Sequence, residues 1–265
     1  MSILSVSGDI DLSTNVIGDI SPLSGLTNLT ELYLNNTGNI TDLSPLSGLT
    51  DLFLLYVRNN AITNVSPLAG LTNLEYLNLA ANQYSDISAL SGLTNLAFLA
   101  INGTADGLPA GDFNGSVTDI SALSGMGVLE LLWIGDNPIS DISVLSQLPS
   151  LGRLYAFKNL ITDVSALQGA INVTRFNLDR NFDLVDIQPL IDNTGLGLDD
   201  NLDLTDTDVS CTDINTLEAR GVFVMHNCVA SPGGVPRRRS TPTPSTLPEV
   251  EDLGERGEDR FRARR

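Results

Sequence analysis

Length, composition and charge exclude several classes of protein. The chain has 265 residues and a net charge of −18, with 42% hydrophobic but only 5% aromatic residues, so aliphatic side chains must fill the core of one or two domains. Residues 1–230 contain 26 acidic and 6 basic residues, whereas residues 231–265 contain 6 acidic residues and 8 arginines. A body this acidic repels nucleic acid and anionic membranes, and we predict no nucleic-acid partner.

The apolar residues are too dispersed for a membrane protein. No run of about 18 apolar residues occurs, so membrane insertion is not predicted. The first residues, MSILSVSGDIDLSTN, contain neither a basic stretch nor a long apolar one. We therefore predict no signal peptide in this sequence.

A unit of about 22 residues recurs along most of the chain. Residues 74–95 read LEYLNLAANQYSDISALSGLTN, and the copy that begins at residue 96 carries an 11-residue insertion, within 104–116. Incomplete copies open and close the array, which gives nine units. The other copies begin at Leu29, Leu52, Leu129, Leu151 and Val173.

Each unit predicts one strand followed by one short turn. Positions 4 and 6 are apolar and alternate with polar positions, which is the period of a half-buried strand. Because the strand recurs in one direction, the strands form a parallel ladder. In residues 85–92, Ser88 is placed to cap a 3₁₀ turn and Gly92 to end it. Tyr84 replaces the usual Ile and is expected in the core or at its edge.

Asparagine at position 9 is expected to satisfy the backbone where the chain leaves each strand. An amide both donates and accepts, so a stacked column of asparagines can bridge neighbouring units. The members of this column are Asn15, Asn60, Asn82, Asn137, Asn159, Asn181 and Asn201.

A capping unit is predicted at residues 209–230, after a solenoid spanning residues 1–208. The segment VSCTDINTLEARGVFVMHNC predicts a helix from Asp213 to Arg220, a stop at Gly221 and a last strand at 222–224. The only two cysteines, Cys211 and Cys228, flank this unit, which favours a disulfide and an oxidising compartment. Two reduced thiols in a cytoplasmic protein are the alternative. Residues 231–265 are rich in Pro, Ser and Arg, which predicts a disordered tail.

The repeat resembles a known family. The 22-residue period and the signature NxIxDISPLSGLTNL are similar to leucine-rich-repeat proteins of the short type, above all bacterial internalins. Over residues 8–226 the resemblance implies an α/β solenoid, a horseshoe with a parallel β-sheet on its concave face and short 3₁₀ turns on its convex face. It also implies a secreted or cell-surface protein whose concave face binds other proteins. Intracellular protein-phosphatase regulators have a similar repeat length.

No catalytic site is predicted. The single histidine, His226, lies in the capping unit without a recognisable second general base. The cysteine spacing lacks the paired short gaps of a zinc site, and no phosphate-binding glycine loop occurs. We therefore predict no enzymatic activity, no cofactor and no metal.

Cation binding remains an alternative at two places. Asp112, Asn114 and Ser116 resemble the start of a calcium loop, but Val117 and Leu123 stand where an EF-hand needs Gly and an acid. Position 13 of the units carries a column of aspartates, which we expect to cap turns rather than to bind cations. These are Asp19, Asp42, Asp86, Asp119, Asp141, Asp163 and Asp186.

The concave face is the candidate binding surface. All five basic residues of the repeats fall on its outward positions, as do the only Trp and every Tyr except Tyr84. Exposed aromatic residues beside arginines are typical of protein interfaces, although sheet propensity alone also favours aromatics. The candidate partner-binding residues are Tyr33, Leu54, Tyr56, Arg58, Tyr76, Asn78, Phe98, Leu131, Trp133, Arg153, Tyr155, Phe157, Lys158, Arg175 and Arg180.

The sequence thus predicts a monomeric, extracellular or cell-surface module that binds a protein or peptide of acidic and apolar character. A glycan is an alternative ligand, because Tyr and Trp also stack on sugar rings. A structural or self-associating surface protein and a cytoplasmic enzyme regulator are the alternative classes. Free thiols in the protein would favour the cytoplasmic regulator.

Overall fold

A computed structural model describes residues 8–103 and 113–228. The chain divides into two compact units, Met1–Cys228 and Val229–Arg265, and every described residue lies in the first. The predicted disordered tail and most of the 104–116 insertion lie outside the described residues.

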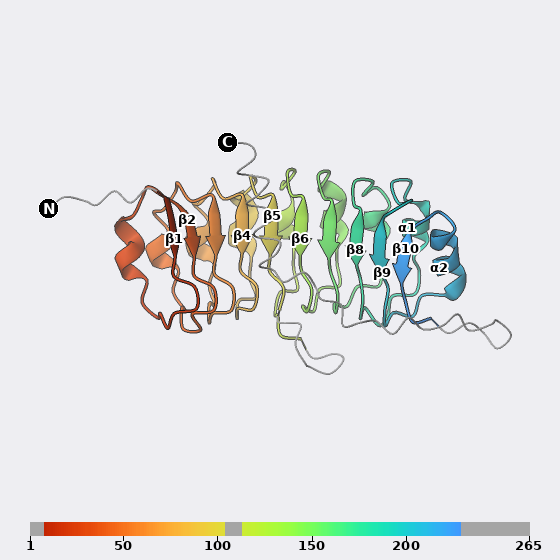
Figure 1. Ribbon diagram of the computed structural model, residues 1–265, viewed down its shortest axis with the longest axis horizontal. Coiled ribbons are helices and arrows are strands. Elements are labelled where there is room, and N and C mark those ends of the chain that lie inside the picture. The colour runs from red at the N-terminus through yellow and green to blue at the C-terminus, as the bar shows by residue number, and fades with distance from the viewer. Residues whose placement is uncertain (1–7, 104–112, 229–265) are drawn as a thin grey trace. The chain divides into compact units, whose positions relative to one another are not determined.

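Ten short strands form one parallel sheet whose order follows the sequence (Figure 1). From β2 to β9 each strand pairs in register with the equivalent strand of the next unit, whereas the pairing of β1 with β2 is irregular after Gly8. The repeat of the sequence thus becomes the repeat of the structure. The predicted leucine-rich-repeat solenoid is therefore confirmed. The strands are β1 (Gly8–Asp11), β2 (Leu29–Tyr33), β3 (Leu54–Tyr56), β4 (Tyr76–Asn78), β5 (Phe98–Ala100), β6 (Leu131–Trp133), β7 (Arg153–Tyr155), β8 (Arg175–Asn177), β9 (Asn201–Asp203) and β10 (Phe223–Met225).

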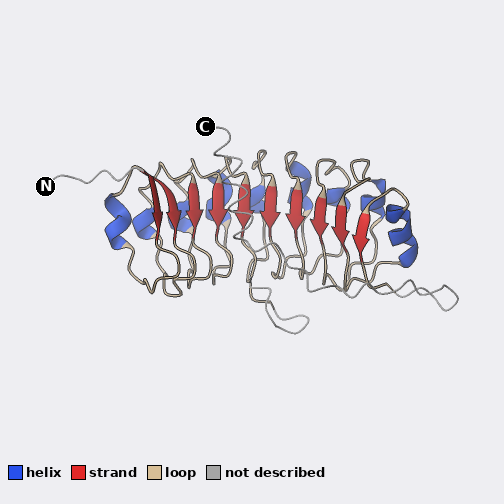
Figure 2. Ribbon diagram, in the orientation of Figure 1, coloured by secondary structure: helices blue, strands red, loops and turns tan. Residues whose placement is uncertain are grey.

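One helical turn per unit lies behind the sheet, on the opposite side of the core (Figure 2). Seven of these turns are 3₁₀ helices of three to five residues, as the sequence predicts, because so few residues separate the start and stop signals. They are η1 (Ser21–Gly25), η2 (Ser44–Leu46), η3 (Ser66–Leu68), η4 (Ser88–Gly92), η5 (Ser121–Leu123), η6 (Ser143–Gln147) and η7 (Ser165–Leu167), and two α-helices follow, α1 (Gln188–Asp192) and α2 (Cys211–Glu218).

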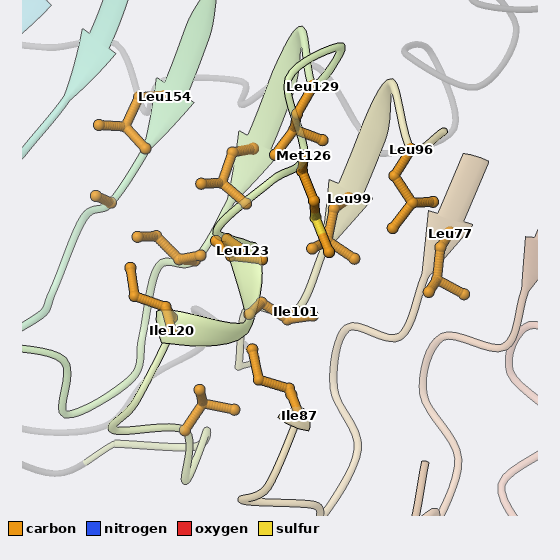
Figure 3. Packing of buried hydrophobic residues seen from close by; sticks show 14 of the residues in the cluster. Leu77, Ile87, Leu96, Leu99, Ile101, Ile120, Leu123, Met126, Leu129 and Leu154 are labelled. Carbon is orange, nitrogen blue, oxygen red and sulfur yellow. The ribbon is translucent and has the colours of Figure 1, made fainter. Parts of the chain in front are cut away.

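The repeated aliphatic residues fill one continuous core between sheet and turns. Side chains such as Leu77, Leu99 and Leu123 are completely buried and lie side by side across neighbouring units (Figure 3). Tyr84 belongs to this core, and its hydroxyl donates a hydrogen bond to the Leu79 carbonyl at 3.1 Å. Burial raises the pKa of Tyr84 far above its ordinary value. One unit alone would expose these leucines, so stacking stabilises the fold.

The asparagine column at position 9 links each unit to its neighbours. Asn82 Nδ2 donates to the carbonyls of Leu79 in its own unit and Val57 in the preceding one, and its Oδ1 accepts from the Ile62 amide. Asn60, Asn137, Asn159 and Asn181 repeat this pattern. The column is therefore confirmed over five units.

The two ends of the predicted column differ from its middle. Asn15 is exposed and bonds only to carbonyls of its own turn. The assignment of Asn201 to position 9 is wrong, since Asn201 begins β9 and pairs with Arg175 and Phe223. Thr207 takes position 9 of that unit, and its hydroxyl donates to the Leu204 carbonyl at 2.8 Å. The repeated Asp and Leu residues around 196–204 allowed two registers, and only strand pairing distinguishes them.

The position-13 aspartates hold the entrance of each helical turn. In all seven units the aspartate Oδ1 accepts the backbone amide two residues later at 2.8 Å. The predicted capping role of Ser88 is wrong: its hydroxyl makes no cap bond, and its amide donates to Asp86. The aspartate, and not the serine, caps the turn because its carboxylate faces the free backbone amide.

The capping unit extends the same sheet and core. Ser210 Oγ accepts from the Asp213 amide, so α2 starts two residues before the predicted helix. The last strand, β10, is Phe223–Met225 rather than 222–224. Gly221 turns the chain with φ +91°, and the disulfide Cys211–Cys228 is present with a Cα separation of 5.6 Å.

An arginine of the capping unit ties α2 to α1. Arg220 donates through Nη2 to the Asn193 carbonyl at 2.6 Å, and also bonds to the carbonyls of Ile191 and Leu196. These carbonyls follow or end a helical turn and would otherwise lack partners. The cap is therefore joined to the last repeat by polar contacts as well as by apolar burial.

Candidate functional site

The side of the sheet turned away from the leucine core is here named the outer sheet face. Strand residues alternate, so Leu132, Leu154 and Phe176 enter the core cluster while Trp133 and Arg153 do not. All the predicted partner-binding residues lie on this face or on the turn directly after its strands. The register places one column over Leu54, Tyr76, Phe98, Leu131, Arg153 and Arg175, and a second over Tyr33, Tyr56, Asn78, Ala100, Trp133, Tyr155 and Asn177.

Aromatic rings contact one another on the outer sheet face, both between neighbouring strands and, for Tyr56 and Phe98, across the strand that lies between them. The ring centroids of Trp133 and Tyr155 are 4.3 Å apart, and those of Tyr56 lie 5.6 Å from Tyr33 and 6.0 Å from Phe98. Strands about 4.8 Å apart bring such rings within stacking distance. Two aromatic groups result, one over β2–β5 and one over β6 and β7.

Several of these rings are buried, whereas the sequence predicted exposed aromatics. Tyr56 is 7% exposed, Phe98 6%, and Trp133 and Tyr155 3% each. Ring-to-ring contact accounts for part of this burial, because each ring covers the flank of the next. The accessible surface of this region therefore belongs to its half-buried and exposed neighbours, Tyr76, Leu131, Arg153 and Arg175.

Position 8 of each unit adopts a left-handed backbone conformation. Positive φ angles recur at Asn36, Asn59, Ala81, Asp136, Lys158 and Arg180, which is where the chain turns away from the strand. Side chains at this position in adjacent units are neighbours, as the 3.0 Å hydrogen bond from Asn59 to Asn36 shows. Glycine, asparagine and aspartate tolerate this conformation more readily than other residues, so Lys158 and Arg180 carry a conformational cost.

Lys158 is not an available cation. Its Nζ lies 2.9 Å from Asp136 Oδ1, and the two side chains are 2% and 0% exposed. Among the described residues its ammonium has no polar partner besides this carboxylate. Its burial and its pairing with Asp136 argue against the prediction that Lys158 contacts a partner. The sequence reasoning missed Asp136, although position 8 of adjacent units would have placed it beside Lys158.

Asp136 also holds the C-terminal end of the 104–116 insertion. Asn114 Nδ2 donates to Asp136 Oδ2 at 3.0 Å, and the Gly115 amide donates to the Asp136 carbonyl at 2.9 Å. At the other end, the Gly103 amide donates to the Gly135 carbonyl at 3.0 Å. A Cβ at Gly103 would lie 2.5 Å from the Asp136 carbonyl oxygen, so glycine is required for this approach.

Three other candidates are engaged within the molecule. Arg180 Nε donates to Asp179 Oδ2 at 2.8 Å, and Asn78 accepts the Ala80 amide at 3.1 Å. Phe157 packs its ring directly over Gly135, where any side chain would clash. Burial, together with the nearby carboxylates of Asp203 and Asp206, raises the pKa of Asp179 although Arg180 acts to lower it.

Three arginines remain without a carboxylate partner in the described part of the chain: Arg58, Arg153 and Arg175. Arg175 is exposed and Arg153 half-buried. Two buried polar atoms nearby, Trp133 Nε1 and Asn102 Oδ1, also have no hydrogen-bond partner among the described residues. These unpaired groups lie over β3 and β5–β8.

Residues 8–103 and 113–228 offer no group of three or more His, Cys, Asp or Glu side chains suited to a metal ion. His226 lies 3.7 Å from Glu218 in the capping unit, away from the outer aromatic groups. The calcium-loop resemblance rests partly on Asp112, which lies outside the described residues. No described helix is both long and apolar enough to cross a membrane.

Comparison with known proteins assigns the repeats to a family. A family model described as Leucine Rich repeats (2 copies) matches residues 9–48 and 50–92. No curated protein matches the chain significantly. The sequence and the fold together make this chain a leucine-rich-repeat protein of the short-repeat type.

The solved structures that resemble it include internalins. An internalin (inlF) from Listeria monocytogenes is 30% identical, with a TM-score of 0.71, and the match covers 84% of this chain and 62% of that one. Internalin C2 from the same species is 27% identical, with a TM-score of 0.61 and coverage of 76% and 79%. A Leptospira interrogans leucine-rich-repeat protein is 18% identical, with a TM-score of 0.64, and the match covers 83% of this chain and 60% of that one. This likeness shows a shared fold. The repeats of this chain thus resemble those of internalins, and the chain spans less than two thirds of the inlF structure.

Proposed function

We propose that the chain is a non-enzymatic recognition module that binds a protein or peptide on its outer sheet face. One observation carries the proposal: unpaired arginines and aromatic rings are gathered on this one face of a strongly acidic molecule. Interfaces are enriched in aromatic residues and arginine, and their affinity depends on a few such residues. The internalin-like repeats support the same reading by analogy of fold.

The disulfide and the internalin-like neighbours support a place outside the cell or on its surface. Disulfides persist in oxidising compartments and are rare in the cytoplasm. A cytoplasmic enzyme regulator is therefore the less favoured class. We further propose that the module acts as a monomer, because its high like charge opposes self-association.

The test is a selection of displayed random peptides on the wild-type chain. Selected peptides are then measured against the double variant Tyr76→Ala/Leu131→Ala, which truncates two half-buried side chains of the outer sheet face. The matched control is Gln147→Ala, at an exposed position of η6 on the other side of the core. Loss of an interfacial anchor typically costs about tenfold or more in affinity.

We expect the double variant to lose at least this much affinity while the control binds as the wild type does. Circular dichroism melting of all three proteins verifies that they are folded. Equal binding by the double variant, or no peptide selected at all, would contradict a binding role for this face.

A further inference from the structure

We propose that Arg153 and Arg175 form an anchor for the carboxylate of an Asp or Glu side chain in the bound peptide. This inference rests on the proposed function and assigns the chemistry of one part of the same face. The two arginines are direct Cα partners across β7 and β8. Strands about 4.8 Å apart therefore hold two positive charges side by side.

This arrangement works against folding stability. Like charges directly opposite on neighbouring strands are destabilising. The chain has 32 acidic residues, yet no carboxylate of residues 8–103 or 113–228 forms an ion pair with either arginine. Glu130, which directly precedes β6, is exposed and pairs with neither arginine. Asp203 lies opposite Asn177 rather than opposite an arginine. An acidic protein that leaves two adjacent arginines unneutralised presents a site for an external anion.

The surroundings favour a carboxylate beside an apolar group. Leu131 is the other direct neighbour of Arg153, and the Trp133–Tyr155 ring pair lies two residues further along the same two strands, on the same face. Tyr155 Oη accepts a long, 3.5 Å contact from Arg175 Nη1, which orients that guanidinium. Guanidinium groups bind carboxylates in a bidentate manner, and nearby apolar surface strengthens the attraction by lowering the local dielectric.

The accessible parts of the anchor are suited to an extended peptide. Arg175 is exposed and Arg153 half-buried, while the rings of Trp133 and Tyr155 beside them are buried. A peptide would place its acidic side chain between the two guanidinium groups and an adjacent apolar side chain over Leu131. Binding would also remove the repulsion between the two arginines.

The experiment uses peptides displayed as N-terminal fusions, which have no free C-terminal carboxylate, selected on the wild-type chain. Selected sequences are resynthesised with acetylated and amidated ends, and their affinity is measured for wild type and Arg153→Gln/Arg175→Gln. Arg180→Gln is the matched control, because it removes an arginine of the same face that is already paired with Asp179. Each acidic peptide is also compared with its Asn or Gln analogue.

We expect selected peptides to share an Asp or Glu next to an apolar residue. Affinity should fall about tenfold or more in the double variant, as for other charge-assisted pairs, and remain unchanged in Arg180→Gln. Replacing the peptide's acid should weaken binding to wild type but add no further loss in the double variant. The melting temperature of the double variant should equal or exceed that of wild type, since a repulsion is removed.

Several results would overturn the anchor. Peptides without a shared acid, or peptides that bind the double variant equally, would contradict it. If those same peptides fail to bind Tyr76→Ala/Leu131→Ala, the proposed function stands and only the anchor is wrong. If a heparin-derived oligosaccharide binds through these arginines at physiological ionic strength while no acidic peptide is selected, the ligand is a sulfated glycan instead.

Discussion

At the scale of single residues, the buried ion pair of Lys158 and Asp136 shows that a cation on the outer sheet face can have a structural role and not a binding role. Both residues occupy position 8, where the backbone is left-handed, and adjacent strands bring them together. The sequence places Lys158 among the outward cations, but the fold uses it to neutralise the buried carboxylate of Asp136, whose other side-chain partner, Asn114, is uncharged. Arg153 and Arg175, at position 3, have no such neighbour in the described chain.

Lys158→Met is expected to lower the free energy of unfolding by about 3–5 kcal/mol, because it leaves the Asp136 carboxylate buried and unpaired. Urea denaturation followed by circular dichroism measures the loss. Asp136→Asn in the same chain should restore most of it, since both charges are then absent and asparagine tolerates the left-handed turn. A loss well under 1 kcal/mol in the single variant would show that the pair contributes little.

At the scale of the repeated element, the aspartate before each helical turn is the part of the unit that responds to pH. The Ser121 amide, bonded to Asp119, lowers the pKa of that carboxyl, and the same cause lowers the pKa of Asp19, Asp86 and Asp141. A carboxyl whose pKa is lowered by folding stabilises the folded state above its unfolded pKa near 3.8. That contribution is lost as the pH falls through the folded-state pKa.

Asp119→Ala is expected to lower the melting temperature at neutral pH, whereas Asp119→Asn should keep most of it. The chain contains the precedent, because Asn64 accepts the Ser66 amide at 2.9 Å in the same position of its unit. Below about pH 4 the wild type should lose stability faster than Asp119→Asn, which does not titrate there. The measurement is the melting temperature of the wild type and both variants between neutral and acidic pH. If the melting temperatures of the wild type and Asp119→Asn depend on pH in the same way, the predicted role of the Asp119 carboxylate is contradicted.

At the scale of the whole molecule, each unit contacts only its neighbours, so stability is distributed along the array. The C-terminal end is closed by α2 and β10, by the hydrogen bonds of Arg220, and by a disulfide across a separation of 17 residues. Unfolding of α2 and β10 should therefore destabilise the last repeat most and the strands in the middle of the sheet least.

Reduction of the disulfide, or Cys211→Ser/Cys228→Ser, is expected to cost about 3 kcal/mol, the typical value for a loop of roughly this size. Hydrogen–deuterium exchange should show lost protection in α2, β10 and β9, with β4 and β5 unchanged. A uniform loss over all ten strands would instead indicate that the array unfolds as one cooperative unit.

The strands and helical turns were predictable because the same sequence pattern recurs in several units. Leu74, Leu77 and Leu79 identify a strand, and Asp86 and Asn82 identify the polar positions around it. Prediction failed at Asn201, which lies in a degenerate unit and was placed in the wrong register. It also failed within a regular unit, where Ser88 was given a role that Asp86 performs. The two registers differ by six residues, an even number, so the alternation of apolar residues along the strand is the same in both and a single degenerate unit does not distinguish them.

The solenoid, the parallel sheet, the asparagine column and the face on which the cations gather were predictable from the amino-acid sequence, since all of these follow from periodicity along the chain. Which of the charged and polar groups are engaged with one another became visible in the three-dimensional structure. Whether Lys158 meets Asp136, or Arg153 meets Arg175, depends on contacts between units about 22 residues apart in the sequence, where strand register and the left-handed turn set the neighbours. Charge pairing is a property of those contacts, and for this reason the candidate anchor emerged from the fold.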